Sequence, residues 1–432
     1  MLPNTTFAGS KSLFSILASA TVVLAAAALW FPIEGEFDVA VMAVPSVIIL
    51  CVALIAIVAK RDSFLFRLMI VALIVKLVAA WIYTALPTFQ LSDIKGIYFD
   101  GAKQFSESSI PLTEYFSLKT LWGTDFIVAM GACIFSLIGP SLAGAMALFA
   151  IASFWGQFLF YCAFVRAFPN GDRRLAAIVL FFSPSVVFWT AAFGKDALVL
   201  FATSLIAYGI SRRFDTRGWS LIVVGLVLAS MVRPHIGAFL AISLFISFLV
   251  TDISRGGRRM IGLKLLLFPV FFIVCLAVVI YSRDSLQLNT VDDASARAEF
   301  SYTNNQIGGS AFGEGESVEQ RLAQSPVLMF RPFPWEANNL TAVLTSVEGV
   351  MLFLVVFLRR RSLFRLLRNA RSSPLAVFAL LFFLMFSFVF SISISNFGLL
   401  ARQRVMVLPL VLTLIVASKS FPLRPAHKLM HA

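Results

Sequence analysis

Two apolar runs, "SILASATVVLAAAALW" at residues 15–30 and "LLLFPVFFIVCLAVVIY" at residues 265–281, decide the class of fold. Each approaches the ~20 consecutive apolar residues that a helix needs to cross the hydrocarbon core of a bilayer. Of the 432 residues, 59% are apolar and 13% are charged, which is more apolar surface than a soluble domain can bury. Because backbone groups find no water inside a bilayer, the chain is predicted to be an all-α, polytopic integral membrane protein.

The net charge of +13 is unevenly distributed along the chain. Lys11 and six short basic stretches hold 23 of the 35 lysines and arginines but 4 of the 22 acids. An excess of basic residues marks cytoplasmic loops, so these stretches and both termini are predicted to lie in the cytoplasm. The charge is therefore a signal of topology, and nucleic acid is not a predicted partner. The six stretches are 60–67, 165–174, 211–217, 252–264, 359–371 and the C-terminal tail.

The whole chain, 1–432, is predicted to form one transmembrane domain with two long extracytoplasmic loops. The first loop covers 87–122, and the second covers 283–340 and contains the acidic, flexible passage "GGSAFGEGE". Loops of this length are usually functional or disordered. The predicted spans are 12–31, 39–59, 64–86, 175–192, 195–211, 218–232, 236–251, 262–282, 341–358, 374–392 and 400–418, with one further region between the third and fourth.

That further region, 123–168, has the pattern of two helices broken at Gly139-Pro140. Two crossings would place Arg166, Arg173 and Arg174 outside, against the charge rule. Charge therefore requires an odd number of crossings, either one span with a helix at the interface or three short spans. The chain is predicted to have about 12–14 spans in total.

The sequence offers little cofactor chemistry. The four cysteines lie inside apolar runs without metal-ligand spacing, and two of the three histidines lie in the C-terminal tail. There is no P-loop and no separate cytoplasmic domain that could bind a nucleotide. We predict no resident cofactor and no specific metal ligand, and a divalent metal is left open.

Charged residues recur at the predicted outer level of the spans. In "FRPFPWEAN" (330–338), two prolines stiffen the chain and hold Arg331 and Glu336 at the mouth of the helices, either as an ion-paired anchor or as part of a ligand site. Arginines on outer turns suit an anionic ligand, against the alternative that they pair internally with Glu348. The other candidates for substrate binding are Lys195, Asp196, Arg233, His235, Arg402 and Arg404.

Two acids of the first long loop are the candidates for catalysis. "LSDIKGIYFDGAKQF" (91–105) contains Asp93 and Asp100, with Tyr98 between them as a candidate for substrate binding. A carboxylate at a membrane mouth can act as general base on an incoming hydroxyl, although solvated loop acids are also common. An enzyme that works outside has no cytosolic nucleotide sugar. A lipid-carried phosphate or diphosphate, bound by arginines that stabilise the departing phosphate, would fit.

These motifs resemble the polytopic glycosyltransferases of the GT-C superfamily. The resemblance rests on "SDIKGIYFDGAKQF" (92–105), "FFSPSVVFWTAAFGKDAL" (181–198) and "RPHIGAFLA" (233–241), and it covers about 87–418. "RPFPWEANN" and "NFGLLARQR" are similar to segments of bacterial exopolysaccharide and O-antigen polymerases. The resemblance implies a GT-C-like fold and a transferase with an external aspartate as base, for which Asp93 matches best by position. Four residues separate Asp93 from its aromatic Tyr98, more than is usual, so Asp100 is a rival.

The resemblance implies a bacterial inner-membrane enzyme of envelope or exopolysaccharide biosynthesis. Its expected partners are a polyprenyl-phosphate- or polyprenyl-diphosphate-linked glycan, membrane lipid and other polysaccharide-assembly proteins. The main alternative is a transporter or flippase of lipid-linked glycans, which would more often have inverted repeats with paired broken spans. No such symmetry is visible in the sequence. A non-catalytic assembly subunit is a third possibility.

Overall fold

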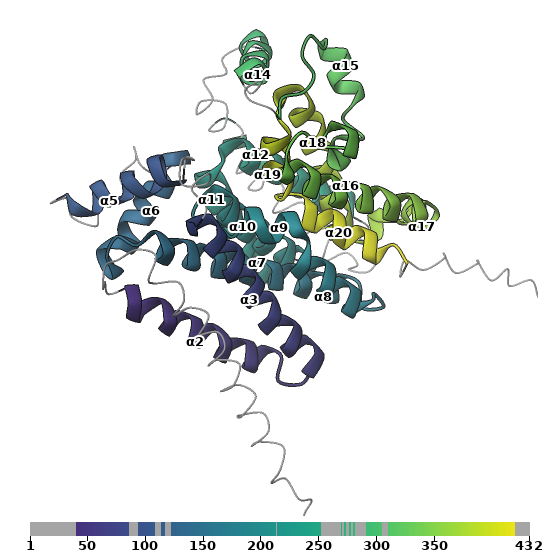
Figure 1. Ribbon diagram of the computed structural model, residues 1–432. Coiled ribbons are helices and arrows are strands. Elements are labelled where there is room, and N and C mark those ends of the chain that lie inside the picture. The colour runs from purple at the N-terminus through teal and green to yellow at the C-terminus, as the bar shows by residue number, and fades with distance from the viewer. Residues whose placement is uncertain are drawn as a thin grey trace, which may run out of the picture. The chain divides into compact units, whose positions relative to one another are not determined.

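The computed structural model of the chain (Figure 1) describes residues 40–85, 94–108, 114–116, 122–212, 214–251, 291–304 and 310–419, with scattered positions between 269 and 280. These residues form helices joined by turns, and an isolated bridge between Ala311 and Asn396 is the extent of β pairing among them. The predicted all-α class is confirmed for this part of the chain. The predicted span 12–31, most of 262–282, and Asp93 lie outside the described residues.

The chain divides into two compact units. Unit 1 contains 1–155 and 187–198, and unit 2 contains 156–186 and 199–432. The helices of unit 1 are α2 (Ala40–Val58), α3 (Ser63–Ala85), η2 (Ile94–Phe99), α5 (Asp100–Glu107) and α6 (Gly123–Ile138). Three helices have residues in both units, namely α7 (Leu142–Ala167), α9 (Pro184–Trp189) and α10 (Lys195–Ser211).

Unit 2 contains the remaining helices, which follow one another to the C-terminal end of the described chain. They are α8 (Arg173–Phe182), α11 (Thr216–Val232), α12 (Pro234–Val250), α14 (Val291–Asn304), α15 (Val318–Ala323), η4 (Leu328–Phe330), η5 (Pro334–Glu336), α16 (Leu340–Leu358), α17 (Arg360–Arg368), η6 (Ala370–Ser372), α18 (Pro374–Ser393), α19 (Phe397–Arg404) and α20 (Leu408–Ala417).

The helices have the lengths and composition of membrane spans. Among the described residues, α3, α7 and α18 are each long and apolar enough to cross a membrane, and the bent pairs α16–α17 and α19–α20 raise the number to five if each pair is one span. Four further apolar helices are shorter, α2, α6, α11 and α12. The apolar helices indicate a membrane protein, whereas the predicted total of spans and the GT-C-like fold stay predictions.

Apolar run length predicts most helix ends well. Seven predicted spans correspond to α2, α3, α10, α11, α12, α16 and α18, with each end within two residues of its predicted position. The helical break predicted at Gly139-Pro140 is also confirmed, because α6 ends at Ile138 and α7 begins at Leu142.

Two of the predicted spans contain a break in the helix that the sequence analysis does not predict. Residues 175–192 divide at Ser183, whose ψ of 117° is not helical, since the following Pro184 disfavours the helical conformation of the residue before it. Residues 400–418 divide at 405–407 with a bend of 59° between α19 and α20. Pro409 has no N–H to donate to Val405, and its ring would clash with that carbonyl in a continuous helix.

The core of unit 1 is aromatic. Phe193 lies edge-on to Tyr98 and Phe149, with ring centroids 6.1 and 4.8 Å apart. Gly131 of α6 allows this packing, because a Cβ there would lie 2.6 Å from the Phe193 ring. Lys76, fully buried in α3, donates from Nζ to Thr190 Oγ1 over 2.5 Å, which satisfies a charged group that burial alone would destabilise.

Unit 2 is built around α18, which packs against α12, α14, α15 and α20 (Figure 1). Helix α11 lies against α12 and approaches α10 closely at Gly225, where a Cβ would be 2.6 Å from the Ala202 carbonyl oxygen. Small residues at such crossings let membrane helices pack closely. Helix α16 contacts η4, η5 and α19. Because η4 and η5 precede α16 in the chain, this segment folds back onto α16.

Candidate functional site

The predicted site residues fall into two groups, one in each unit. Unit 1 contains Tyr98, Asp100, Lys195 and Asp196, and unit 2 contains Arg233, His235, Arg331, Glu336, Arg402 and Arg404. Asp93 lies outside the described residues. That the two groups line a single cavity stays a prediction.

Among the predicted site residues of unit 1, Asp100 is the exposed acid. It is the first residue of α5 and is exposed, whereas Tyr98 two residues earlier is 4% exposed and packs on Phe193. At the first turn of α10, Lys195 Nζ donates to Thr124 Oγ1 over 2.9 Å and Asp196 is buried. Of these four side chains, Asp100 is therefore the one that could reach an incoming hydroxyl from solvent.

Unit 2 contains a buried ion pair between Arg404 and Glu348. Arg404 Nη2 donates to Glu348 Oε2 over 2.6 Å and to the Ser185 hydroxyl over 2.9 Å. The carboxylate also accepts from Ser183 Oγ at 2.7 Å and from the backbone N–H and the hydroxyl of Ser185. The Arg404 and Glu348 side chains are 1% and 12% exposed, so these hydrogen bonds take the place of water for both charges.

The broken helices explain why serines meet this carboxylate. Ser185 lies in the first turn of α9, where a backbone N–H has no partner within the helix, and Glu348 of α16 accepts from it. Ser183 stands at the break that precedes Pro184. Arg404 likewise ends α19 at the second break. Irregular backbone at membrane depth is tolerated where it is buried in protein or lines a cavity, and here it surrounds an ion pair.

Arg404 also binds the backbone of the segment before α16. Its Nη1 donates to the carbonyl oxygens of Met329 and Arg331 over 3.3 and 3.2 Å. Arg404 Nε is buried and has no hydrogen-bond partner among the described residues. This arginine therefore fixes the position of residues 329–331 relative to α19.

Arg331 forms a second ion pair, nearer the surface. Its Nε and Nη2 donate to Glu336 Oε1 over 3.0 and 2.6 Å, and Nη1 donates to Gln324. The guanidinium carbon lies 4.4 Å from the centre of the Phe312 ring and 5.2 Å from that of Phe397. The side chains of Arg331 and Glu336 are 11% and 18% exposed, so this pair is mostly buried but partly accessible to solvent.

Helix α19, which contains Arg404 and contacts Arg331, also contacts a third arginine, Arg233. Arg233, at the junction of α11 and α12, donates from Nη1 to Gln403 Oε1 over 2.5 Å and is 8% exposed. His235 is half-buried beside Phe390, with ring centroids 6.4 Å apart, and Arg402 is half-buried on α19. The eight-residue helix α19 thus contacts Arg233 through Gln403, Arg331 through Phe397, and Glu348 through Arg404.

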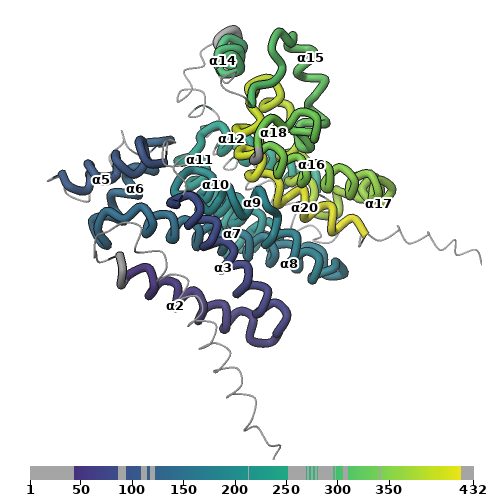
Figure 2. Tube along the Cα trace, viewed as in Figure 1, coloured from purple at the N-terminus to yellow at the C-terminus, as the bar shows by residue number. Residues whose placement is uncertain are grey.

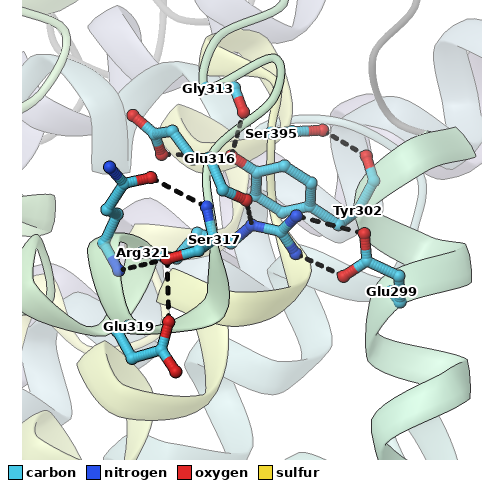
Figure 3. Close-up of polar contacts among 9 residues, drawn as sticks. Glu299, Tyr302, Gly313, Glu316, Ser317, Glu319, Arg321 and Ser395 are labelled. Carbon is cyan, nitrogen blue, oxygen red and sulfur yellow. Dashed lines mark hydrogen bonds and ion pairs between the residues drawn. The ribbon is translucent and has the colours of Figure 1, made fainter.

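An outer cluster orders the acidic segment before this site (Figure 3). Arg321 donates from Nη1 and Nη2 to Glu299 over 2.6 and 3.1 Å, and its guanidinium carbon lies 3.6 Å from the centre of the Tyr302 ring. Tyr302 Oη donates to the Gly313 carbonyl over 3.0 Å, and burial raises the pKa of Tyr302 to about 12. Gly313 has a φ of 72°, and a Cβ there would meet Tyr302 Oη, so both conformation and space require glycine.

The outer cluster should loosen in acid. The hydrogen bonds from Arg321 lower the pKa of the Glu299 carboxyl, so its ionised form stabilises the folded segment. This stability is present above the ordinary glutamate value of about 4.3 and is lost as the pH falls through the lowered pKa. The protection factors of backbone amides in 299–304 and 310–321, which are corrected for the pH dependence of intrinsic exchange, should be lower at pH 3 than at pH 6. Arg321→Gln should lower the protection factors at pH 6 and leave a smaller difference in protection between pH 6 and pH 3, and an unchanged difference would contradict this assignment.

Comparison with known protein families, with curated proteins and with solved structures finds no match to this chain. The class of the protein therefore rests on its own geometry. Apolar helices of spanning length and a buried site of ion pairs at broken helices define an α-helical membrane protein with a charged interior. Among the described residues, no group of three or more His, Cys, Asp or Glu side chains could hold a metal ion.

Several residues of the site are absent from the sequence prediction. The sequence identifies Glu348 as a possible partner for the arginines. It does not identify Ser183, Ser185, Gln324 or Gln403 as residues of the site. Serines and glutamines beside arginines have no spacing that identifies them, and the Ser185–Arg404 contact joins positions 219 residues apart. The available signal was the prolines, since Pro184 and Pro409 within apolar runs mark the breaks where these polar groups meet.

Proposed function

We propose that the protein is a membrane-embedded glycosyltransferase or polysaccharide polymerase that acts on a polyprenyl-phosphate- or polyprenyl-diphosphate-linked glycan. The observation that carries the proposal is that α19 contacts two guanidinium groups, those of Arg233 and Arg331, and ends at a third arginine, Arg404, in a membrane protein. Charged side chains at membrane depth are costly and are usually retained for a substrate or ion pathway. A phosphate anchored to lipid is the anionic ligand that can reach such a site from the bilayer.

Arg331 is the guanidinium best suited to exchange partners. Among the described residues its hydrogen bonds use three of the five N–H donors that a guanidinium carries. Its carboxylate partner, Glu336, is 18% exposed, whereas Glu348 beside Arg404 is 12% exposed and accepts additional bonds from two serines. A phosphate can occupy the remaining donors of Arg331 or replace Glu336 with the same bidentate geometry. Arg404 then holds the segment that carries Arg331 in place.

The proposed reaction joins two sugars without a nucleotide. The acceptor hydroxyl attacks the anomeric carbon of the donor, the bond from that carbon to the phosphate oxygen breaks, and the lipid phosphate leaves. The hydroxyl proton passes to an external aspartate, Asp93 or the exposed Asp100, as general base. Arg331 stabilises the negative charge that develops on the departing phosphate.

The test is transfer by purified, full-length protein in liposomes that contain a polyprenyl-diphosphate-linked oligosaccharide. The proposal expects longer glycans or glycan transferred to an acceptor, and it expects Asp93→Asn or Asp100→Asn to abolish the products while the protein remains folded. Arg173→Gln, an exposed change on α8, serves as the control and should retain activity. Absence of product with several such donors, from a protein that is monodisperse and helical, would refute the transferase.

A transporter of lipid-linked glycans is the second candidate, and the broken helices favour it. Discontinuous helices at α8–α9 and α19–α20 both end beside charged groups, as they do at the substrate sites of many transporters. The same liposomes distinguish the two functions. Movement of the labelled lipid-linked glycan between leaflets without any new glycosidic bond would favour the transporter.

A further inference from the structure

Helix α17 is a short basic helix that follows a sharp bend. The axis turns by 70° between α16 and α17 (Figure 2). Nineteen residues of α16, at about 1.5 Å per residue, are nearly long enough to cross the hydrocarbon core. Since spanning helices tilt by about 20° on average, a turn of this size lays the following helix close to the membrane plane.

The surface around α17 carries positive charge and exposed apolar groups together. Phe364 is 67% exposed, Leu367 is 50% exposed, and Leu358 at the end of α16 is 75% exposed. Residues 359–371 contain six arginines, and no acid occurs in the chain after Glu348. An exposed helix that combines basic and apolar residues in this way is typical of segments that lie at a membrane interface.

The arginines around α17 differ in what they do. Arg359 donates from Nη1 to the Ile415 carbonyl oxygen of α20 over 2.9 Å, and Leu366 is buried, so these residues attach the bend to the rest of unit 2. Arg360, Arg361 and Arg365 are exposed and, with Phe364, form one open surface patch. Three arginines beside one exposed phenyl ring match a ligand that has a phosphate next to a hydrocarbon chain.

We propose that this surface patch of α17 is a binding site for the headgroup of an anionic phospholipid. The phosphate binds Arg360, Arg361 and Arg365, and the upper part of an acyl chain packs against Phe364. A free phosphate would use the arginines but not the ring, whereas a zwitterionic lipid would use the ring but gain little from the charge. Anionic lipid satisfies both, and its retention would hold the bend between α16 and α17 at the membrane surface.

The size of the effect follows from charge. Each arginine near an anionic surface favours binding by about fivefold, so loss of all three should weaken binding by about 100-fold. The attraction should also decline as salt is added, because exposed charges are screened. Substitution by glutamine removes charge and retains good helix propensity, so α17 should still form.

The experiment measures binding of phosphatidylglycerol to the full-length protein in a neutral detergent, with phosphatidylcholine of the same chains and inorganic phosphate as separate ligands. Arg360→Gln/Arg361→Gln/Arg365→Gln should lose about 100-fold in affinity for phosphatidylglycerol. The matched control Arg173→Gln/Arg174→Gln/Arg217→Gln removes the same charge from exposed positions of unit 2 and should bind as the unaltered protein does. Phe364→Ser should weaken the lipid and leave phosphate unaffected.

Three outcomes would overturn the proposal. They are equal binding of phosphatidylglycerol and phosphatidylcholine, an equal loss in the two triple variants, and inorganic phosphate that binds as tightly as the lipid. If the first triple variant cannot be purified, Arg361→Gln and the salt dependence of the unaltered protein decide the question. An affinity for phosphatidylglycerol that changes neither with Arg361→Gln nor with added salt would also overturn the proposal.

Discussion

Replacement of Arg404 by leucine should destabilise unit 2 by about 3–5 kcal/mol, because it leaves the buried Glu348 carboxylate without its cationic partner. For a unit of this size, the thermal unfolding midpoint should fall by about 10 °C. The double replacement Arg404→Leu/Glu348→Leu removes both charges and should recover much of the loss, since a buried ion pair can be replaced by apolar residues at little cost. Unfolding in detergent, followed by circular dichroism, gives the three midpoints.

The matched control is an exposed ion pair in the same unit. Arg212 Nη2 lies 2.5 Å from Asp215 Oδ2, but the two side chains are 17% and 42% exposed. Arg212→Leu should therefore lower the midpoint far less than Arg404→Leu does. Equal shifts in midpoint for Arg404→Leu and Arg212→Leu would contradict the claim that burial makes the Arg404–Glu348 pair important for the stability of unit 2.

Replacement of Arg331 by lysine should reduce glycan transfer by about 100- to 1,000-fold in kcat/KM, if the proposed function holds. Lysine retains the charge but has no planar fork, so it cannot bind a phosphate in bidentate fashion. Release of radiolabelled lipid diphosphate in the reconstituted liposomes measures this rate. The expected loss lies in the step that separates the sugar from the phosphate, where charge develops on the leaving group.

Arg321 provides the control for Arg331. It too lies over an aromatic ring and pairs with a carboxylate, since its guanidinium carbon is 3.6 Å from the centre of the Tyr302 ring and Nη1 is 2.6 Å from Glu299. Arg321→Lys should therefore disturb the same loop and leave transfer near its original rate. A comparable loss of transfer in both variants would show that Arg331 acts through loop structure and not through phosphate.

The limits of the sequence prediction are physical. The length of an apolar run sets where α10 and α18 begin and end. Every backbone N–H and C=O group along the run must be hydrogen-bonded within the helix, because the bilayer offers no water. The same runs tolerate a proline, so the breaks at Ser183 and Val405 do not interrupt the apolar pattern that predicts a span. Hydropathy measures how apolar a segment is, and it does not record which backbone groups are satisfied.

Only the charged residues of the candidate site could be predicted from the sequence. Arginines in an apolar chain are conspicuous, and of those predicted, Arg404 belongs to α19 while Arg233 and Arg331 contact it. Their partners are neutral or distant, such as Gln403 for Arg233, and long-range pairing leaves no spacing rule in the sequence. Whether an arginine serves a ligand or an internal carboxylate depends on these partners.

The most direct test of the central claim is photo-crosslinking between a residue beside Arg331 and the proposed substrate. Benzoylphenylalanine at position 312 would place the reactive group beside Arg331, because the Phe312 ring centre lies 4.4 Å from the guanidinium carbon. With radiolabelled polyprenyl-diphosphate-linked oligosaccharide in liposomes, we expect a crosslink that unlabelled donor displaces and that Arg331→Lys abolishes. Labelling that is absent, or that persists unchanged with excess donor and with Arg331→Lys, would contradict the account.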